Sequence, residues 1–356
     1  MNPLTISVLC GATMLGSWAL TRVVRSYALV RGVLDVPNER SSHVVPTPRG
    51  GGTAIVLATV SALCILALAD ALPWYVVVGF AGPGGIVAGA GLLDDLRHLR
   101  WRWRLLAHFG AAYTLLISMG GIRPITTFGD AVSGWLIWPI ALLYIVWLIN
   151  LTNFMDGIDG LAASEAVTVS AGGALLYAIA APTADGWRVA LVFAAAAGGF
   201  LIWNRPPASI FMGDVGSGFL GFSLAAMSLY ARLVSPQMFW GWIVLLGVFV
   251  VDASMVLIRR ILRGDQVFDA HRTHAYQHAA ARWRTHGGVT LVVVALNLFW
   301  LLPLACLVAL HRLEVVTGVV IAYAPLVIAA VWLGAGAPAL TGQTRSARST
   351  GENVGR

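Results

Sequence analysis

Apolar segments long enough to cross a lipid bilayer as helices recur along the whole chain. A hydrocarbon layer about 30 Å thick needs about 20 apolar residues in a helix, and the segments lack the short alternating pattern of a membrane β-barrel. Hydrophobic residues make up 58% of the 356 positions and charged residues only 11%, so a water-soluble domain of this size would lack polar surface. We therefore predict an all-α polytopic integral membrane protein with about eleven transmembrane helices. The expected spans are 3–21, 51–69, 74–93, 105–121, 134–151, 163–182, 189–203, 215–233, 241–258, 289–309 and 317–334.

The distribution of arginine predicts the orientation of these spans. The chain contains no lysine, and if the N-terminus lies outside, 19 of the 23 arginines fall in loops on the inner side. Cytoplasmic loops carry the excess of basic residues in membrane proteins, so we expect the N-terminus outside and the C-terminus in the cytoplasm. The net charge of +7 then indicates attraction to anionic membrane lipid and does not indicate a nucleic-acid partner.

One membrane domain is expected over residues 1–334, because no soluble domain interrupts the apolar segments. Residues 335–356 are rich in Gly, Ala, Thr, Arg and Ser, and we expect a disordered cytoplasmic tail there. Basic residues follow the first apolar segment, at Arg22 and Arg25, so we interpret it as a retained helix and not as a signal peptide. The three cysteines lie inside expected spans, which argues against disulfide bonds and thiolate metal sites.

Carboxylates gather at the ends of two expected spans. Asp94 and Asp95 end the third span, and Asp214 lies between glycines at the start of the eighth. Adjacent carboxylates repel each other, so they are kept together mainly where a cation or a proton-transfer role compensates. A solvated pair at a helix end and a simple helix cap are the alternatives for these acids.

A second polar stretch follows the fifth span, where Asn150, Asn153, Asp156 and Asp159 recur every three residues. This spacing places the side chains on one face if the helix continues, and in a turn that lines a polar pocket if the helix breaks at Gly157. An ordinary Asn/Asp/Gly loop between two spans is the alternative.

The longest cytoplasmic loop, about residues 259–288, is rich in arginine and histidine. Four of the eight histidines of the chain lie there, at His271, His274, His278 and His286. No cysteine or glutamate accompanies them, so a phosphate or pyrophosphate suits this loop better than zinc does. A solvated basic loop against anionic lipid is the alternative.

Three further features are less specific. Arg49 precedes a run of glycines whose N–H groups could bind an anionic ligand, or which form only a turn before the next span. Asp252 lies inside the ninth span, where an acid is either functional or hydrogen-bonded to a neighbouring helix. The run WRWR at 101–104 is typical of an interfacial anchor, and we expect no catalytic role for it.

The carboxylate clusters and the histidine loop all fall on the cytoplasmic side of the expected topology, which predicts one shared site. Carboxylates with few other ligand types indicate a hard cation, Mg²⁺ or Mn²⁺, and a diphosphate is the natural partner of a sparsely ligated Mg²⁺. A site at the membrane edge can receive one substrate from water and another from lipid. The pattern therefore favours phosphoryl transfer from a soluble nucleotide diphosphate compound to a lipid-borne acceptor.

Six motifs carry a resemblance to a known family. They are PNERSSH at 37–43, PTPRGG at 46–51, DD at 94–95, NFMDGIDG at 153–160, FMGDVGS at 211–217 and HRTHAYQ at 271–277. In this order they resemble the polyprenyl-phosphate N-acetylhexosamine-1-phosphate transferase family, glycosyltransferase family 4. The resemblance implies transfer of a sugar 1-phosphate from a UDP-N-acetylamino sugar to undecaprenyl phosphate, with release of UMP. It also implies a requirement for Mg²⁺, and an active site on the cytoplasmic face of the bacterial inner membrane.

The resemblance further implies roles for the acids. Asp214 would bind the metal, and Asp94 would take the proton of the acceptor phosphate or assist its attack. Asp95 would support the phosphate or the metal, and Asp156 would be a third catalytic acid in the nucleotide and metal pocket. One position departs from the family, since His98 stands where the acidic motif often carries a lysine.

The resemblance also implies a set of substrate-binding residues. Among them Phe211 would stack near uracil, and His271 and His274 would hold the pyrophosphate. The full set is Arg49, Asn153, Asp159, Phe211, His271, Arg272 and His274.

The histidine loop lacks the His-His-His run of the peptidoglycan branch, so the resemblance favours the branch that initiates O-antigen or other surface polysaccharides. The donor would be UDP-N-acetylglucosamine or a 6-deoxy relative, and a peptidoglycan lipid I synthase is the first alternative. Weaker alternatives are a secondary transporter for an anionic solute, which would place charges near the midplane, and a CDP-alcohol phosphotransferase, whose motif expects Ala-Arg at 158–159. The sequence leaves open the sugar, the number of chemical steps and whether the chain forms a homodimer.

Overall fold

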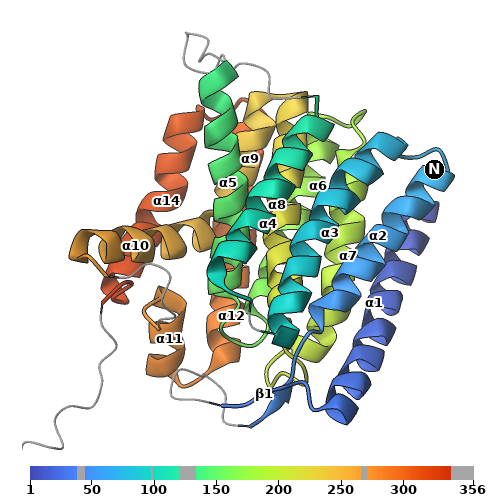
Figure 1. Cartoon of the computed structure of the whole chain (residues 1–356). Helices are drawn as coiled ribbons and strands as arrows, with labels where there is room; N and C mark the ends of the chain where they lie inside the picture. Colours follow the sequence, from blue (N-terminus) through green and yellow to red (C-terminus); the bar gives the residue numbers. More distant parts are fainter. Residues whose placement is uncertain (38–44, 98, 121–133, 266–271, 338–356) are drawn as a thin grey trace, which may run out of the picture.

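The computed structural model describes residues 1–37, 45–97, 99–120, 134–265 and 272–337 (Figure 1). His98, His271 and residues 338–356 of the expected tail lie outside these ranges. Most described residues are helical, and the two short strands among them, β1 (Leu34–Asp35) and β2 (Thr47–Pro48), pair antiparallel. The prediction of an all-α membrane protein is confirmed.

The long helices run up and down through one bundle, with α1 at one edge and α14 at the other (Figure 1). A π-helical segment, η1, joins α12 to α13. In chain order the helices are α1 (Pro3–Arg31), α2 (Gly52–Leu68), α3 (Trp74–Arg97), α4 (Trp101–Ser118), α5 (Gly134–Met155), α6 (Leu161–Ala180), α7 (Gly186–Asn204), α8 (Asp214–Val234), α9 (Pro236–Leu245), α10 (Gly247–Arg263), α11 (Ala275–Trp283), α12 (His286–Leu296), η1 (Asn297–Leu301), α13 (Leu302–Ala309) and α14 (Val315–Trp332).

Among the described residues, eight helical segments are long and apolar enough to cross a membrane, and nine if α9 and α10 count as one span. Each of the eleven expected spans overlaps a helix. However, α2 has only 17 residues, and α4 carries Arg102, Arg104 and His108, so neither is among the eight. Length and composition therefore support a multi-pass membrane protein with fewer qualifying spans than we expected.

The expected span at 241–258 is wrong as a single straight crossing. The chain bends by 71° between α9 and α10, and α10 lies across the direction of the other helices (Figure 1). The apolar residues of this segment do not signal the bend. The bend is explained by the residues that follow it. The helix α10 has polar and apolar faces and exposes Ile258, Ile261 and Leu262 beside its arginines. Helices of this kind lie along a membrane interface more readily than through a membrane.

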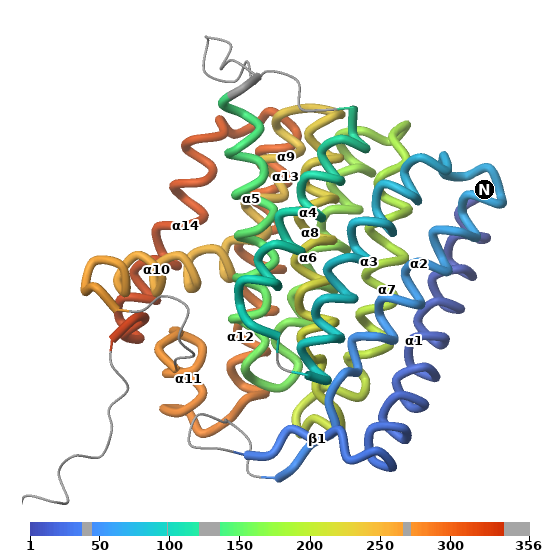
Figure 2. Tube along the Cα trace, viewed as in Figure 1, coloured from blue at the N-terminus to red at the C-terminus, as the bar shows by residue number. Residues whose placement is uncertain are grey.

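The centre of the bundle is α8. Its apolar stretch is the most deeply buried of the eight candidate spans, with 78% of its residues buried inside the protein. It packs against α2, α3, α5 and α9, and its trace runs through the middle of the molecule (Figure 2). Small residues permit this approach. A Cβ on Gly221 would lie 2.4 Å from the carbonyl oxygen of Leu148 in α5, and one on Gly216 would lie 2.6 Å from the Cα of Gly52 in α2. Close contacts of this kind drive helix association inside membranes.

The crossing of α3 and α8 gives a prediction for Gly91. A Cβ there would lie 2.4 Å from the carbonyl oxygen of Asp214 and 2.5 Å from the amide nitrogen of Val215. We expect Gly91→Ala to push the helices apart, to cost about 1–3 kcal/mol as over-packing does, and to lower the apparent melting temperature of the detergent-solubilised protein. Gly89→Ala is the matched control, because nothing lies within 4 Å of a Cβ at Gly89. Equal melting temperatures for the two variants would contradict this crossing.

Candidate active site

The C-terminal ends of α3 and α5 and the N-terminal end of α8 meet at the end of the bundle where β1 lies (Figure 1). Asp95, in the last turn of α3, is buried against the start of α8. Its Oδ1 accepts a hydrogen bond from the backbone N–H of Asp214 at 3.1 Å, and its Oδ2 accepts one from Val215 at 3.2 Å. A carboxylate at this place satisfies two otherwise unpaired donors and interacts favourably with the helix dipole. Asp95 therefore fixes the start of α8.

Gly213 makes this contact between α3 and α8 feasible. Its φ is +76°, and a Cβ on it would lie 2.6 Å from Oδ2 of Asp95. Arg49 supports the same carboxyl from the other side, since its Nε lies 3.8 Å from Oδ1 of Asp95 and its Nη2 donates to the Asp95 backbone carbonyl. The predicted anion-binding arginine thus contacts a predicted catalytic acid.

Asp94 and Asp214 share one cation, Arg104 of α4. Nη1 of Arg104 donates to Oδ2 of Asp94 at 2.5 Å and to Oδ2 of Asp214 at 2.7 Å. The backbone N–H of Leu99 also donates to Oδ1 of Asp94, at 2.6 Å. Asn153 of α5 donates from Nδ2 to Oδ1 of Asp214 and to Oγ of Ser217, each at 2.9 Å. Three of the predicted site residues therefore converge on one arginine-centred cluster.

Arg104 is the residue that sequence reasoning missed. We expected the run at 101–104 to be an interfacial anchor, but only part of it is exposed: Arg102 is on the surface, whereas Arg104 points into the cluster. Helical spacing carried the signal. Arg104 and His108 are four residues apart and share a face of α4, and His108 is buried, with its Nδ1 3.4 Å from Nδ2 of Asn150.

Asp156 lies in the turn between α5 and α6, as the break at Gly157 suggested. Burial, with the negative charges of Asp214, Asp95 and Asp159, raises the pKa of Asp156 well above its ordinary value of 3.8. Two of these charges, Asp214 and Asp95, lie at the start of α8, and the third, Asp159, lies beside His286. Asp156 is therefore electrostatically linked to both groups.

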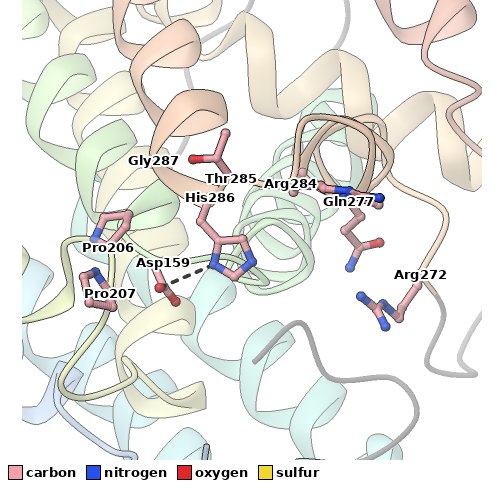
Figure 3. A pocket seen from close by; sticks show the side chains of 11 residues that line it. Asp159, Pro206, Pro207, Arg272, Gln277, Arg284, Thr285, His286 and Gly287 are labelled. Carbon is pink, nitrogen blue, oxygen red and sulfur yellow. Dashed lines mark ion pairs between the residues drawn. The ribbon is translucent and has the colours of Figure 1, made fainter. Parts of the chain in front are cut away.

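Asp159 borders a cavity of about 660 Å³ (Figure 3). Its Oδ2 accepts the backbone N–H of Ala208 at 3.1 Å and lies 3.4 Å from Nδ1 of His286. In Figure 3 the imidazole of His286 faces Asp159, while Arg272 stands on the side of Gln277. Arg272 and Arg284 contribute two positive charges to the lining. Two guanidinium groups and an imidazole around one cavity suit a phosphorylated ligand.

Asp252 has a definite structural task. Its side chain is buried on α10 and receives the backbone N–H groups of Ala275 at 2.9 Å and Tyr276 at 3.0 Å, at the start of α11. Oδ1 of Asp252 also lies 3.2 Å from Nδ1 of His274. The ring of His274 stacks on Tyr276, with centroids 5.6 Å apart. Asp252 therefore positions both His274 and the helix that forms one wall of the cavity.

The remaining predicted residues are divided between these places. Phe211 lies beside the segment that carries Arg49, since its backbone N–H donates to the carbonyl of Pro48 and its carbonyl accepts from Gly51. His274 lies with Asp252 and is not among the residues lining the cavity. Sequence reasoning therefore found most of the acids, but not the partition into an arginine-centred cluster and a basic cavity.

The donor set of the arginine-centred cluster is compatible with Mg²⁺. Among the described residues, no group of three or more His, Cys, Asp or Glu is arranged to hold a metal ion. Mg²⁺ commonly keeps several waters and takes only one or two protein carboxylates, with substrate phosphates completing its shell. Asp214 and Asp94 offer two such carboxylates with hard oxygen atoms. These two carboxylates suit a cation whose binding is completed by the substrate, and they do not form a complete metal site without it.

The chain is similar to known membrane transferases. The family model described as Glycosyl transferase family 4 matches residues 74–232. The chain is 31% identical to a probable undecaprenyl-phosphate N-acetylglucosaminyl 1-phosphate transferase of Bacillus subtilis, over 77% of each chain. It is 31% identical to decaprenyl-phosphate N-acetylglucosaminephosphotransferase of Mycobacterium tuberculosis, over 77% of this chain and 75% of the relative. It is 33% identical to phospho-N-acetylmuramoyl-pentapeptide-transferase of Synechococcus elongatus, over 70% of this chain and 69% of the relative.

The contacts of Asp252 predict a loss of function without loss of the fold. In Asp252→Asn one oxygen becomes an NH₂ group, which cannot accept a hydrogen bond, so one of the two N–H groups of α11 loses its acceptor. We expect faster proteolysis around α11 and a fall in substrate turnover of about tenfold or more, the scale seen when a positioning partner is removed. Asp265→Asn, at the exposed end of the same segment, is the control and should behave as wild type. If Asp252→Asn is cleaved around α11 at the same rate as wild type, the positioning role of Asp252 is wrong.

The raised pKa of Asp156 predicts how stability depends on pH. Between its ordinary pKa of 3.8 and its raised value, the unfolded chain loses this proton while the folded protein keeps it. The folded state then binds more protons, so this contribution to stability is lost as the pH rises through the folded pKa. We expect the melting temperature of wild type to fall relative to that of Asp156→Asn as the pH rises, by about 2–4 °C for each kcal/mol. Parallel profiles for the two proteins, with exposed Asp70→Asn as control, would contradict the assignment.

Proposed function

The chain belongs to glycosyl transferase family 4, and on that premise we propose that it transfers an N-acetylamino-sugar 1-phosphate from a UDP-sugar to undecaprenyl phosphate, giving undecaprenyl-diphosphate-sugar and UMP. The names of the three relatives support the type of reaction, since each refers to a phosphate-linked amino sugar and two refer to a polyprenyl phosphate. Family membership does not favour the transporter or the CDP-alcohol phosphotransferase.

The observation that carries the proposal is the adjacency of two unlike groups at one end of a membrane bundle. The arginine-centred cluster of Asp94, Arg104 and Asp214 lies at the helix ends, where a phosphate borne by a lipid would arrive. The cavity with Arg272, Arg284 and His286 is polar and suits a water-soluble phosphorylated donor. Asp156 responds to the charges of both regions. A transfer between a lipid phosphate and a soluble diphosphate needs this combination.

Each residue has a part in the proposed reaction. In the cavity, Arg272, Arg284 and His286 neutralise the charge of the donor diphosphate. Asp94, held as an anion by Arg104 and by the N–H of Leu99, accepts the proton of the acceptor phosphate. The freed acceptor oxygen then bonds to the phosphorus next to the sugar, and the bond from that phosphorus to the UMP oxygen breaks. UMP leaves with the bonding electrons.

Asp214 is the residue that would hold Mg²⁺, with the carboxylate of Asp94 beside it, and Asn153 donates to the other oxygen of Asp214 and orients it. The ion supplies positive charge that offsets the charge on the migrating phosphoryl group. We assign Asp95 to positioning and not to metal binding, because both its carboxylate oxygens accept N–H groups of α8. Its loss would displace Asp214 rather than remove a ligand.

The finer assignment concerns the sugar, the location and the pathway. We propose UDP-N-acetylglucosamine or a 6-deoxy relative as donor, supported by the two relatives named for N-acetylglucosamine, each of which aligns with 77% of this chain. We place the site on the cytoplasmic face of the inner membrane, supported by the excess of arginine on that side of the expected topology. The product would initiate O-antigen or another surface polysaccharide. A peptidoglycan lipid I synthase is the alternative, which the cyanobacterial relative supports.

The test is a transfer assay with purified protein, undecaprenyl phosphate and a panel of UDP-sugars, followed by mass spectrometry of the lipid product. We expect UMP release that requires both the polyprenyl phosphate and Mg²⁺. Asp214→Asn should lower turnover by more than about 100-fold, because it removes the charge of a metal ligand, while insertion and folding are retained. Asp185→Asn is the control, since Asp185 pairs with Arg188 ahead of α7, away from the cluster. Near-normal turnover by Asp214→Asn would refute the metal assignment, and UMP release without lipid would refute the acceptor.

A further inference from the structure

Arg104 stands in the position that a divalent cation at Asp214 would need. One nitrogen atom, Nη1, lies 2.5 Å from Oδ2 of Asp94 and 2.7 Å from Oδ2 of Asp214, so a single positive centre bridges two carboxylates. The other oxygen of Asp214 accepts a hydrogen bond from Nδ2 of Asn153 at 2.9 Å. Both Asp214 oxygens are therefore engaged by donors. A metal ion must displace one of these donors to reach a lone pair on Asp214.

Of the two donors, Arg104 is the one placed to move. Asn153 is also hydrogen-bonded to Oγ of Ser217, which lies on the same helix as Asp214 and keeps the amide in place. Arg104 has a long side chain that is 30% exposed, and its Nε is buried without a hydrogen-bond partner in the described part of the chain. A buried donor without a partner is unfavourable. The present position of the guanidinium is therefore maintained by its attraction to Asp94 and Asp214.

The same charge explains how the cluster persists when no divalent cation is bound. Asp94, Asp95 and Asp214 meet at one helix end, and like charges at this distance repel each other. Arg104 neutralises part of this charge. A divalent cation would neutralise it more completely and would leave the guanidinium available to a phosphate, for which its planar array of donors is suited.

We infer that Arg104 is an internal counter-cation: it competes with the divalent metal for Asp214, yields that carboxylate when the metal binds, and then faces a substrate phosphate. The inference rests on the proposed function only in taking Asp214 as the metal ligand. It differs from that proposal in its test, because the measurements use metal ions and inorganic pyrophosphate and require no sugar transfer.

The first experiment is a titration of the full-length, substrate-free protein in detergent with Mn²⁺, followed by the electron paramagnetic resonance signal of the free ion. An opposite charge close to a carboxylate changes its affinity for a proton by about 10- to 1000-fold, and a competing cation experiences the same field. We therefore expect Arg104→Gln to bind Mn²⁺ at least about tenfold more tightly than wild type. Arg104→Lys, which keeps the charge, should stay close to wild type.

Arg102→Gln is the matched control, because it removes the same charge from the same helix at an exposed position stacked on Trp101. Its Mn²⁺ affinity should equal that of wild type. Unchanged or weaker Mn²⁺ binding by Arg104→Gln would overturn the inference. Tighter binding by Arg102→Gln as well would reduce the effect to general surface charge and would overturn it too.

A second measurement needs no variant and remains decisive if Arg104→Gln does not fold. Phenylglyoxal modifies accessible arginines, and peptide mass spectrometry reports each site separately. We expect Mg²⁺ alone to raise the modification of Arg104 and inorganic pyrophosphate added with Mg²⁺ to suppress it, while Arg102 changes little. Unchanged or reduced modification of Arg104 with Mg²⁺ would overturn the inference. A failed transfer assay would leave both measurements valid, since neither contains a sugar nucleotide or a polyprenyl phosphate.

Discussion

The hydrogen bonds from the first turn of α8 to Asp95 determine where the central helix of this protein begins. Two N–H groups in this turn have no carbonyl acceptor within the helix, and they donate to a carboxylate of α3 instead. The contact requires Gly213, whose positive φ and absent Cβ bring the two backbones together. Because α8 touches α2, α3, α5 and α9, an error at this point would displace groups on several helices at once. The start of α8 also presents Asp214, so the same bonds build the fold and the site.

The site is an arrangement of charge as much as of shape. Five carboxylates from three chain segments approach one end of the bundle, and each region has its own positive partners. Arg49 accompanies Asp95, Arg104 joins Asp94 to Asp214, and His286 faces Asp159. Opposite charges close to carboxylates favour their ionised forms, and proximity of like charges does the reverse. Burial raises the pKa of Asp156, and the charges of Asp214, Asp95 and Asp159 raise it further. A multivalent phosphate and its metal would add their charges to this part of the site.

Much of this could be predicted from the sequence because hydrophobic length and motif order are local properties. The apolar segments predicted an all-α membrane protein, and six motifs in sequence predicted the family, which relatives covering most of the chain confirm. The grouping of Asp94, Asp95, Asn153 and Asp214 also followed, since helix ends on one side of a membrane tend to meet. What failed depended on contacts between distant segments. In the sequence Arg104 looks like its neighbour Arg102, and only the fold shows that its side chain reaches Asp214 at the start of α8. The bend after α9 lies inside an uninterrupted apolar run.

Asp252 was equally ambiguous from sequence, because an acid in a predicted span gives no sign of its partner, and here that partner is the start of α11. This attachment has a mechanical consequence. From Asp252 to Leu262, α10 extends about 15 Å at 1.5 Å per residue, and its far end bears exposed apolar side chains that face lipid in a membrane protein. The far end of α10 is attached as well, because Arg259 and Arg263 donate to the backbone carbonyls of Ala335 and Gly336 after α14. Through these contacts α10 joins the wall of the cavity to the last helix of the bundle.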